Sequence, residues 1–358
     1  MRMPAVVAVL PSRAVSNAER VSQLVAANAH LSPDVQRKLA RTANALLALS
    51  GARTRYERGA GETTRSLAVE AGTRALELAG WSPDTLDGVI SGSVTRACLE
   101  PATAAVLASA LSVPRAQCFD LSEACMGWLR AVQVAQLYLD AGLWKRALIL
   151  NVETNTHWAS LRVSGQEGEL AHTLPQLTIG EAATATLLEA GGDPWPLWFS
   201  SAPGGQHLCE LTLPGGEQFR APETPAREDF RFYCHFGEMN QFTLEHFGGQ
   251  YLHFLEGEVR AKGRPVDCVL THASEASGWQ RWAEGCGLGS LFHSIYPSYG
   301  NVVSASIPTG LAHSIQTGRL QAGGGVYLYV ASSGMGVGGG WFRWEGASDL
   351  IAHRPGAG

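Results

Sequence analysis

Apolar residues along this chain fall into short continuous runs, typical of buried strands, and into longer stretches with a helical period. Residues 64–79 repeat apolar side chains at helical spacing, and Gly80 then ends the predicted helix. Another helix is predicted to begin at Ser32, a capping residue followed by proline. Apolar runs of strand length in the first half lie at residues 5–10, 88–93, 117–121, 147–153 and 184–188. We therefore expect buried strands that alternate with covering helices.

The second half repeats this order. Residues 267–274 match residues 87–94 in polarity, position by position. A helix predicted over 304–317 corresponds to the helix that follows Cys125. Predicted strands over 326–330 and 340–344 correspond to those over 148–152 and 184–188. Two halves with the same strand–helix–strand order indicate a duplicated α/β unit whose halves are related by a pseudo-twofold axis.

Glycine and proline residues at 191–196 interrupt the pattern between the two halves. We therefore place the domain boundary there, with an N-terminal half over 1–192 and a C-terminal half over 193–358. Segment 200–228 is rich in proline and glycine and is predicted to be irregular, with no assigned role. Residues 238–262 are predicted to form a single long helix.

Composition narrows the function classes. The chain has 358 residues, 45% of them hydrophobic and 16% charged, which is ample for large buried cores. A net charge of −5 and the absence of a Lys/Arg run argue against nucleic acid as a partner. No apolar stretch is long enough to span a membrane, and the N-terminal one is too short for a signal peptide, so we expect a cytoplasmic protein.

Seven cysteines show neither a CxxC pair nor Cys/His ligand spacing, which disfavours a disulfide framework and a metal site. Cys125 stands out because it follows a strand and precedes a helix, where the helix dipole favours the thiolate. A small buried core residue is the alternative interpretation. In the second half, His272 follows a strand and Asn301 lies in a turn before a helix. These are residue types that hold a thiol proton and stabilise a developing oxyanion.

The segments SEACMGW, VLTHASE and PSYGNVVSASIP and the glycine-rich C-terminal region resemble the ketosynthase III branch of the thiolase superfamily, which includes 3-oxoacyl-ACP synthase III. The resemblance runs in order from about residue 5 to 344. It implies a duplicated αβαβα fold, a homodimer and a Cys–His–Asn triad formed by Cys125, His272 and Asn301. It also implies an acyltransferase whose partners are acyl-CoA or acyl carrier protein, with no further cofactor.

The implied reaction loads an acyl group onto Cys125, with backbone N–H groups from Cys125 and the turn at Gly334 and Gly336 as oxyanion donors. Claisen condensation with a second thioester follows, in which His272 and Asn301 hydrogen-bond the enolate oxygen. Transfer to a hydroxyl or amine in natural-product biosynthesis is the alternative, and a non-catalytic partner subunit is a further one. Whether the condensation is decarboxylative stays open.

Three features refine the resemblance. The segment CLEPATA, with Glu100, and the segment TIGEAATATLLE are similar to olefin-pathway condensing enzymes, in which a glutamate acts as base in the partner subunit's site. Glu100 could equally be ordinary helix-start chemistry. Ala45 and Leu49 stand where initiating ketosynthases clamp the CoA adenine with tryptophan and arginine. The C-terminal GMGVGG has the form of a GxGxxG motif, but no helix is predicted after it, which argues against a dinucleotide site.

Overall fold

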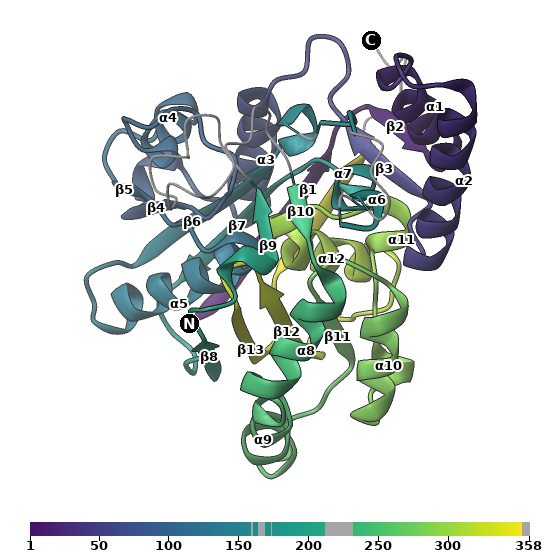
Figure 1. Cartoon of the computed structure of the whole chain (residues 1–358). Coiled ribbons are helices and arrows are strands. Elements are labelled where there is room, and N and C mark those ends of the chain that lie inside the picture. Colours follow the sequence, from purple (N-terminus) through teal and green to yellow (C-terminus); the bar gives the residue numbers. More distant parts are fainter. Residues whose placement is uncertain (159, 164–168, 173, 212–231, 353–358) are drawn as a thin grey trace.

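A computed structural model describes residues 1–158, 160–163, 169–172, 174–211 and 232–352. Two mixed β-sheets form the centre of its fold (Figure 1). The first sheet has six strands in the order β14-β1-β7-β6-β4-β5, and the second has four in the order β11-β12-β13-β8. The first comprises β14 (Ala347–Ala352), β1 (Arg2–Leu10), β7 (Ala182–Glu189), β6 (Arg146–Glu153), β4 (Gly88–Ser91) and β5 (Gln117–Asp120). The second comprises β11 (Cys268–Thr271), β12 (Gly325–Ser332), β13 (Gly336–Arg343) and β8 (Leu197–Ser201).

The two sheets share one topology. In the first, β4 runs parallel to β6, β6 antiparallel to β7, and β7 antiparallel to β1. In the second, β11 runs parallel to β12, β12 antiparallel to β13, and β13 antiparallel to β8. The predicted duplicated α/β fold is therefore confirmed. The final strand, β14, pairs with β1 in the first sheet, while the predicted boundary between residues 192 and 193 stays a prediction.

Twelve α-helices are found in the described part of the chain. They are α1 (Asn17–Ala27), α2 (Pro33–Ser50), α3 (Thr64–Ala79), α4 (Thr103–Ala110), α5 (Gly127–Asp140), α6 (Glu169–His172), α7 (Leu174–Thr178), α8 (Phe236–Phe247), α9 (Gln250–Phe254), α10 (Ser277–Gly285), α11 (Tyr296–Tyr299) and α12 (Ser306–Gln316). Short strand pairs join β2 (Arg13–Ser16) to β3 (Thr54–Glu57) and β9 (Cys209–Leu211) to β10 (Phe232–Cys234). The predicted Ser32 and Gly80 caps are both confirmed.

Side-chain alternation along the strands produces five layers. Ala5, Val7 and Val9 of β1 pack with α3 and α4 on one face of the first sheet. Residues from α5 and α12 form a core with the inner faces of both sheets, which includes Leu328 of β12. Tyr327, on the opposite face of β12, packs against α9 and α10. The order is helices, sheet, helices, sheet, helices, as expected for the αβαβα arrangement (Figure 1).

The prediction of one long helix over residues 238–262 is wrong. The structure divides this stretch into α8, α9 and a π-helical turn, η6 (Leu255–Arg260). Gly248 and Gly249 separate the first two, and Gly249 has a φ of +90°, outside the right-handed helical region. Two consecutive glycines therefore end the helix despite the apolar periodicity on either side. In segment 200–228, β9 begins at Cys209, and residues 212–228 lie outside the described part of the chain.

Candidate active site

Cys125 lies in a short turn between β5 and α5. This turn is a 3-10 element, η2 (Ala124–Met126), and α5 begins two residues after the cysteine. Ala124 has a φ of +45°, a left-handed conformation that is unfavourable in free energy for a residue with a Cβ. This conformation changes the direction of the chain just before Cys125. The Cys125 side chain is buried in the core between the two sheets. The apolar surroundings, rather than a helix terminus alone, therefore dominate the environment of this thiol.

Burial raises the pKa of the Cys125 thiol, and negative charge on Cys209 and Glu153 raises it further. Hydrogen bonds from the backbone N–H groups of Ser333 and of Cys125 itself oppose this rise without cancelling it. The expected preference for thiolate is therefore outweighed by desolvation. Cys125 rests as a thiol, so attack on an electrophile requires a group that accepts its proton.

His272 directly follows β11 and is buried. Burial lowers the pKa of this imidazole to about 4, and a hydrogen bond to the Val303 carbonyl offsets only part of the effect. Nδ1 lies 3.2 Å from the Ser306 hydroxyl, whose only proton is donated to Val303 O at 2.7 Å. The tautomer with its hydrogen on Nδ1 fits this contact, because the Ser306 proton is already used. The neutral ring keeps its free lone pair on Nε2, which is the form of a proton acceptor.

Asn301 is held in place through its backbone. Its N–H donates to Thr178 O, and its carbonyl accepts from Gly180 N, each at 2.9 Å. The segments that contain Gly180 and Asn301 approach so closely that a Cβ on Gly180 would overlap the Tyr299 carbonyl. Asn301 Oδ1 accepts a hydrogen bond from Val303 N at 2.9 Å, which leaves the Nδ2 hydrogens as the donors of this side chain.

The three predicted residues meet around one turn, η8 (Val303–Ala305). Val303 N binds Asn301, Val303 O accepts from His272, and the Val303 side chain packs in the same apolar cluster as Cys125. Val303 has a φ of +47°, like Ala124 in the equivalent turn of the first half. The pseudo-twofold relation therefore places two strained turns, η2 and η8, in contact across the interface between the halves.

Glu153 is a buried residue of this region that sequence reasoning missed. It ends β6, is fully buried, and accepts hydrogen bonds from Val94 N at 3.0 Å, Asn155 Nδ2 at 2.7 Å and the Ser304 hydroxyl. Desolvation raises the pKa of this carboxyl. Because Ser304 belongs to η8, the carboxylate ties the first half to that turn. A glutamate at the end of a strand that is buried almost throughout is the sequence signal that could have found it.

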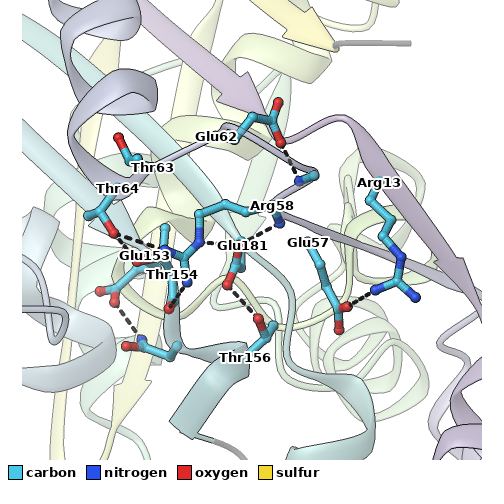
Figure 2. Close-up of polar contacts among 12 residues, drawn as sticks. Arg13, Glu57, Arg58, Glu62, Thr63, Thr64, Glu153, Thr154, Thr156 and Glu181 are labelled. Atoms are coloured by element: carbon cyan, nitrogen blue, oxygen red, sulfur yellow. Dashed lines mark hydrogen bonds and ion pairs between the residues drawn. The ribbon is translucent and has the colours of Figure 1, made fainter. Parts of the chain in front are cut away.

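A second buried polar network supports the chain segment that clamps Asn301 (Figure 2). Glu181 follows Gly180 and is fully buried, and Arg58 Nε lies 3.1 Å from its carboxylate. Arg58 N donates to the same carboxylate at 2.8 Å, and Thr156 donates to it through its hydroxyl. Figure 2 shows these groups converging on Glu181 from separate segments. The TIGEAATATLLE segment thus serves as an anchor for the Asn301 turn.

The glycine-rich turn between β12 and β13 lies against η2. Gly334 has a φ of +81°, and Gly336 begins β13, where a Cβ would lie 2.9 Å from the Met126 side chain. The backbone group that reaches the Cys125 sulfur belongs to Ser333, one residue before the predicted Gly334. The turn is followed directly by the strands β13 and β14, so as far as residue 352 the GMGVGG motif lacks the strand–helix context of a dinucleotide site.

Glu100 is not brought to this site within one chain. It lies in an exposed loop, and its neighbour Leu99 is 90% exposed. Ala45 and Leu49 lie on the exposed face of α2, with Leu49 76% exposed.

A cavity of about 300 Å³ lies between α8 and α10. Its lining is largely aromatic and apolar and includes Phe236, Met239, Trp279 and Trp282. Ser274, two residues after His272, also lines it, and Phe236 and Met239 pack against the cluster that contains Cys125. The cavity is therefore lined by a residue close to His272 in the sequence and by side chains that pack against the apolar cluster around Cys125.

Within the described ranges, no group of three or more His, Cys, Asp or Glu side chains is arranged to hold a metal ion. The same residues contain no helix with the length and apolarity required to cross a bilayer.

Comparisons with known proteins agree with this architecture. Residues 119–202 match the family profile described as 3-Oxoacyl-[acyl-carrier-protein (ACP)] synthase III, and residues 260–344 match its C-terminal profile. The beta-ketoacyl-[acyl-carrier-protein] synthase III of Symbiobacterium thermophilum is 28% identical over 299 residues, 82% of this chain and 88% of the relative. That of Rhizobium meliloti is 28% identical over 312 residues, with the same coverage.

Solved structures share the fold across nearly the whole chain. The 3-oxoacyl-(acyl-carrier protein) synthase of Burkholderia xenovorans superposes with a TM-score of 0.79 at 20% identity, covering 98% of this chain and 96% of the other. A histidine variant of Xanthomonas campestris OleA superposes with a TM-score of 0.78 at 18% identity, covering 96% and 99%.

Proposed function

This chain belongs to the ketosynthase III branch of the thiolase superfamily, and from that premise we propose that it is a condensing enzyme. Cys125 takes an acyl group from acyl-CoA or acyl carrier protein. The acyl group then forms a carbon–carbon bond with a second thioester. The observation that carries this proposal is the meeting of Cys125, His272 and Asn301 around the Val303 turn, with two backbone N–H groups at the sulfur.

The first half-reaction is loading. The Cys125 sulfur attacks the thioester carbonyl while its proton passes to Nε2 of His272, the ring nitrogen left without a hydrogen. The N–H groups of Cys125 and Ser333, together with the adjacent Gly334–Gly336 turn, supply donors for the oxyanion. Collapse of the intermediate breaks the bond to the donor thiol, which leaves with the proton from His272. A neutral His272 suits this role because it is unprotonated at the start.

The second half-reaction is condensation. The acceptor thioester forms an enolate, and Asn301 Nδ2 donates a hydrogen bond to its oxygen. The enolate carbon attacks the acyl carbonyl, the new carbon–carbon bond forms, and the Cys125 thiolate leaves. The enolate arises by loss of CO2 from a malonyl-type acceptor or by removal of a proton from a simple acyl thioester. In the second case we assign the base to Glu100, which reaches the site of a second copy of the chain in a homodimer.

The aromatic cavity between α8 and α10 suits the pantetheine arm or acyl chain of the substrate, because its lining is largely apolar. Arg281 at this cavity offers a cation for a phosphate of the substrate. The exposed Ala45 and Leu49 provide no aromatic clamp for an adenine, which favours a carrier-protein donor. We expect no further cofactor.

Product analysis tests the condensation step. The purified protein is incubated with an acyl thioester donor and either a malonyl or a second acyl thioester, each as the CoA and the carrier-protein form. A 3-oxoacyl product supports the proposal, and an ester or amide with an added alcohol or amine as the sole product contradicts it. Glu100→Gln distinguishes the two enolate routes, because it abolishes condensation without CO2 release but spares the decarboxylative reaction. The matched control is Glu77→Gln, an exposed glutamate on α3.

A further inference from the structure

Two of the other six cysteines lie beside the candidate nucleophile, Cys125. Cys209 of β9 and Cys234 of β10 are buried in the same apolar cluster as Cys125, and all three are free thiols. Ser333 joins them, because its backbone N–H reaches the Cys125 sulfur and its hydroxyl donates to the Cys209 carbonyl. The condensation chemistry proposed above uses only Cys125, so the other two thiols have no role in it.

Cys209 and Cys234 stand directly opposite each other on the paired antiparallel strands β9 and β10. Figure 1 shows these two short strands. His235 N donates to Leu208 O at 2.8 Å, immediately outside the pair. This pattern makes the two cysteines a non-hydrogen-bonded pair, the position in an antiparallel ladder where the Cα atoms are about 4.5 Å apart and the side chains are closer. Disulfides require Cα separations of roughly 4.4–6.8 Å. The strands therefore hold the two thiols at a spacing that a disulfide can bridge.

The pKa values of the two thiols also shift in opposite directions. A hydrogen bond between them lowers the pKa of Cys209, and the same contact raises the pKa of Cys234. Met239 Sδ, 3.9 Å from Cys234 Sγ, is a second and weaker acceptor for the Cys234 proton. Cys209 is thus the nucleophilic member of the pair and Cys234 the proton donor, which is the asymmetry of a reactive dithiol.

We propose that Cys209 and Cys234 form a redox-active dithiol that a hydroperoxide converts into a cross-strand disulfide beside Cys125. The Cys209 sulfur attacks the peroxide, an S–O bond forms, the O–O bond breaks, and an alcohol or water leaves with one thiol proton. The Cys234 sulfur then attacks the Cys209 sulfur, the S–S bond forms, the S–O bond breaks, and water leaves with the second proton. Two thiols are oxidised by two electrons, and the peroxide is reduced by two.

The position of the pair gives this chemistry a consequence for Cys125. Oxidant that reaches this cluster meets a more readily ionised thiol in Cys209 than in Cys125, whose pKa is raised by burial. The disulfide also removes the Cys209 charge that contributes to the raised pKa of Cys125. The dithiol therefore spares the nucleophile from oxidation and, once oxidised, makes its ionisation easier.

Peroxide titration followed by peptide mapping tests the proposal without any thioester, so its outcome is independent of the proposed condensation. The reduced protein receives a small molar excess of hydrogen peroxide and is then denatured, alkylated, digested and mapped. We expect loss of two hydrogens from the intact mass, a peptide pair linking Cys209 to Cys234, and recovery with dithiothreitol, while Cys125 stays alkylatable. Oxidation of Cys125 with the pair still reduced, or a disulfide between Cys125 and Cys209, overturns the proposal.

Variants identify the attacking thiol. In Cys234→Ser, Cys209 should form a sulfenic acid that dimedone traps, whereas Cys209→Ser should slow oxidation of the remaining thiol at least tenfold. The matched control is Cys286→Ser, a buried cysteine at the end of α10 in a different cluster, which should oxidise as the wild type does. Equal oxidation rates in Cys209→Ser and the control contradict the assignment. Because the mapping is made first on the wild type, the proposal stays testable even if a variant fails to fold.

Discussion

Replacing Gly92 with alanine tests whether the rate at which Cys125 reacts depends on the position of the first residues of α5. Gly92 follows β4, and a Cβ there would lie 2.7 Å from the Gly127 carbonyl oxygen and 2.9 Å from Asn151 Nδ2. An ordinary carbon–oxygen contact is about 3.3 Å, so the start of α5 must retreat by roughly 0.6 Å. Gly127 is two residues after Cys125, and the displacement therefore carries the thiol with it.

The size of the effect follows from this displacement. A misplacement of about 1 Å can cost about a hundredfold in rate, so a shift of roughly 0.6 Å should cost about tenfold, or about 1.4 kcal/mol of activation free energy. Overpacking of this kind also lowers the free energy of unfolding by about 1–3 kcal/mol. The variant should therefore melt several degrees lower than the wild type yet remain folded at 25 °C.

Single-turnover loading measures this directly. The protein is mixed with excess acyl thioester, quenched at short times, and the acyl adduct is quantified by intact mass. Gly285→Ala is the matched control, since a Cβ there meets nothing within 4 Å and the residue has no positive φ. A Gly92→Ala variant that is folded by circular dichroism and loads as fast as Gly285→Ala refutes the reasoning.

Three further predictions concern the residues around Cys125 and their supports. His272→Ala should slow loading, because the thiol proton loses its acceptor, whereas Asn301→Ala should slow condensation selectively. Rapid-quench intact mass and product formation separate the two steps, and undiminished loading in His272→Ala contradicts the base role. Because burial lowers the pKa of His272 from 6.5 to about 4, the unfolded chain binds this proton first, and the free energy of unfolding falls as the pH drops through this window. Melting temperatures measured between pH 7 and pH 4 should show a shallower slope for His272→Gln than for the wild type, and equal slopes in the two proteins would contradict this reasoning. Glu181→Gln weakens a buried ion pair and should lower the free energy of unfolding by about 1–3 kcal/mol in urea titrations, against less than about 0.5 kcal/mol for Glu256→Gln, an exposed i,i+4 pair. Equal losses of unfolding free energy in these two variants would contradict the prediction that burial strengthens the contribution of the Glu181 ion pair.

The fold was predictable because it rests on local periodicity. Strands such as β6 and β12 are buried on both faces, so each contains a continuous apolar run. The matching of residues 87–94 with 267–274 revealed the duplication. The failure at Gly248 and Gly249 is equally local, since apolar periodicity continues across a point where the backbone cannot. Helix and strand signals were thus sufficient wherever glycine did not override them.

The surroundings of Cys125 were only partly predictable. The positions of Cys125, His272 and Asn301 at strand and helix ends could be found by comparing the two halves. The contacts that set their chemistry could not, because they join residues far apart in the sequence. Burial of Cys125, the hydrogen bond from Ser304 of η8 to Glu153, and the pairing of Cys209 with Cys234 all depend on how segments distant in the sequence pack. A sequence pattern reports which face a residue takes, but not which charge or thiol lies beside it.

The central claim is that Cys125 carries the acyl group, and peptide mapping after incubation with an acyl thioester tests it most directly. The protein is incubated with acyl-CoA or acyl carrier protein, quenched in acid, digested, and searched for the acyl mass on each of the seven cysteines. We predict an adduct on the Cys125 peptide that is absent in Cys125→Ser and retained in Cys286→Ser. An adduct that persists in Cys125→Ser at the wild-type level, or no adduct on the wild type with either class of donor, would contradict the account.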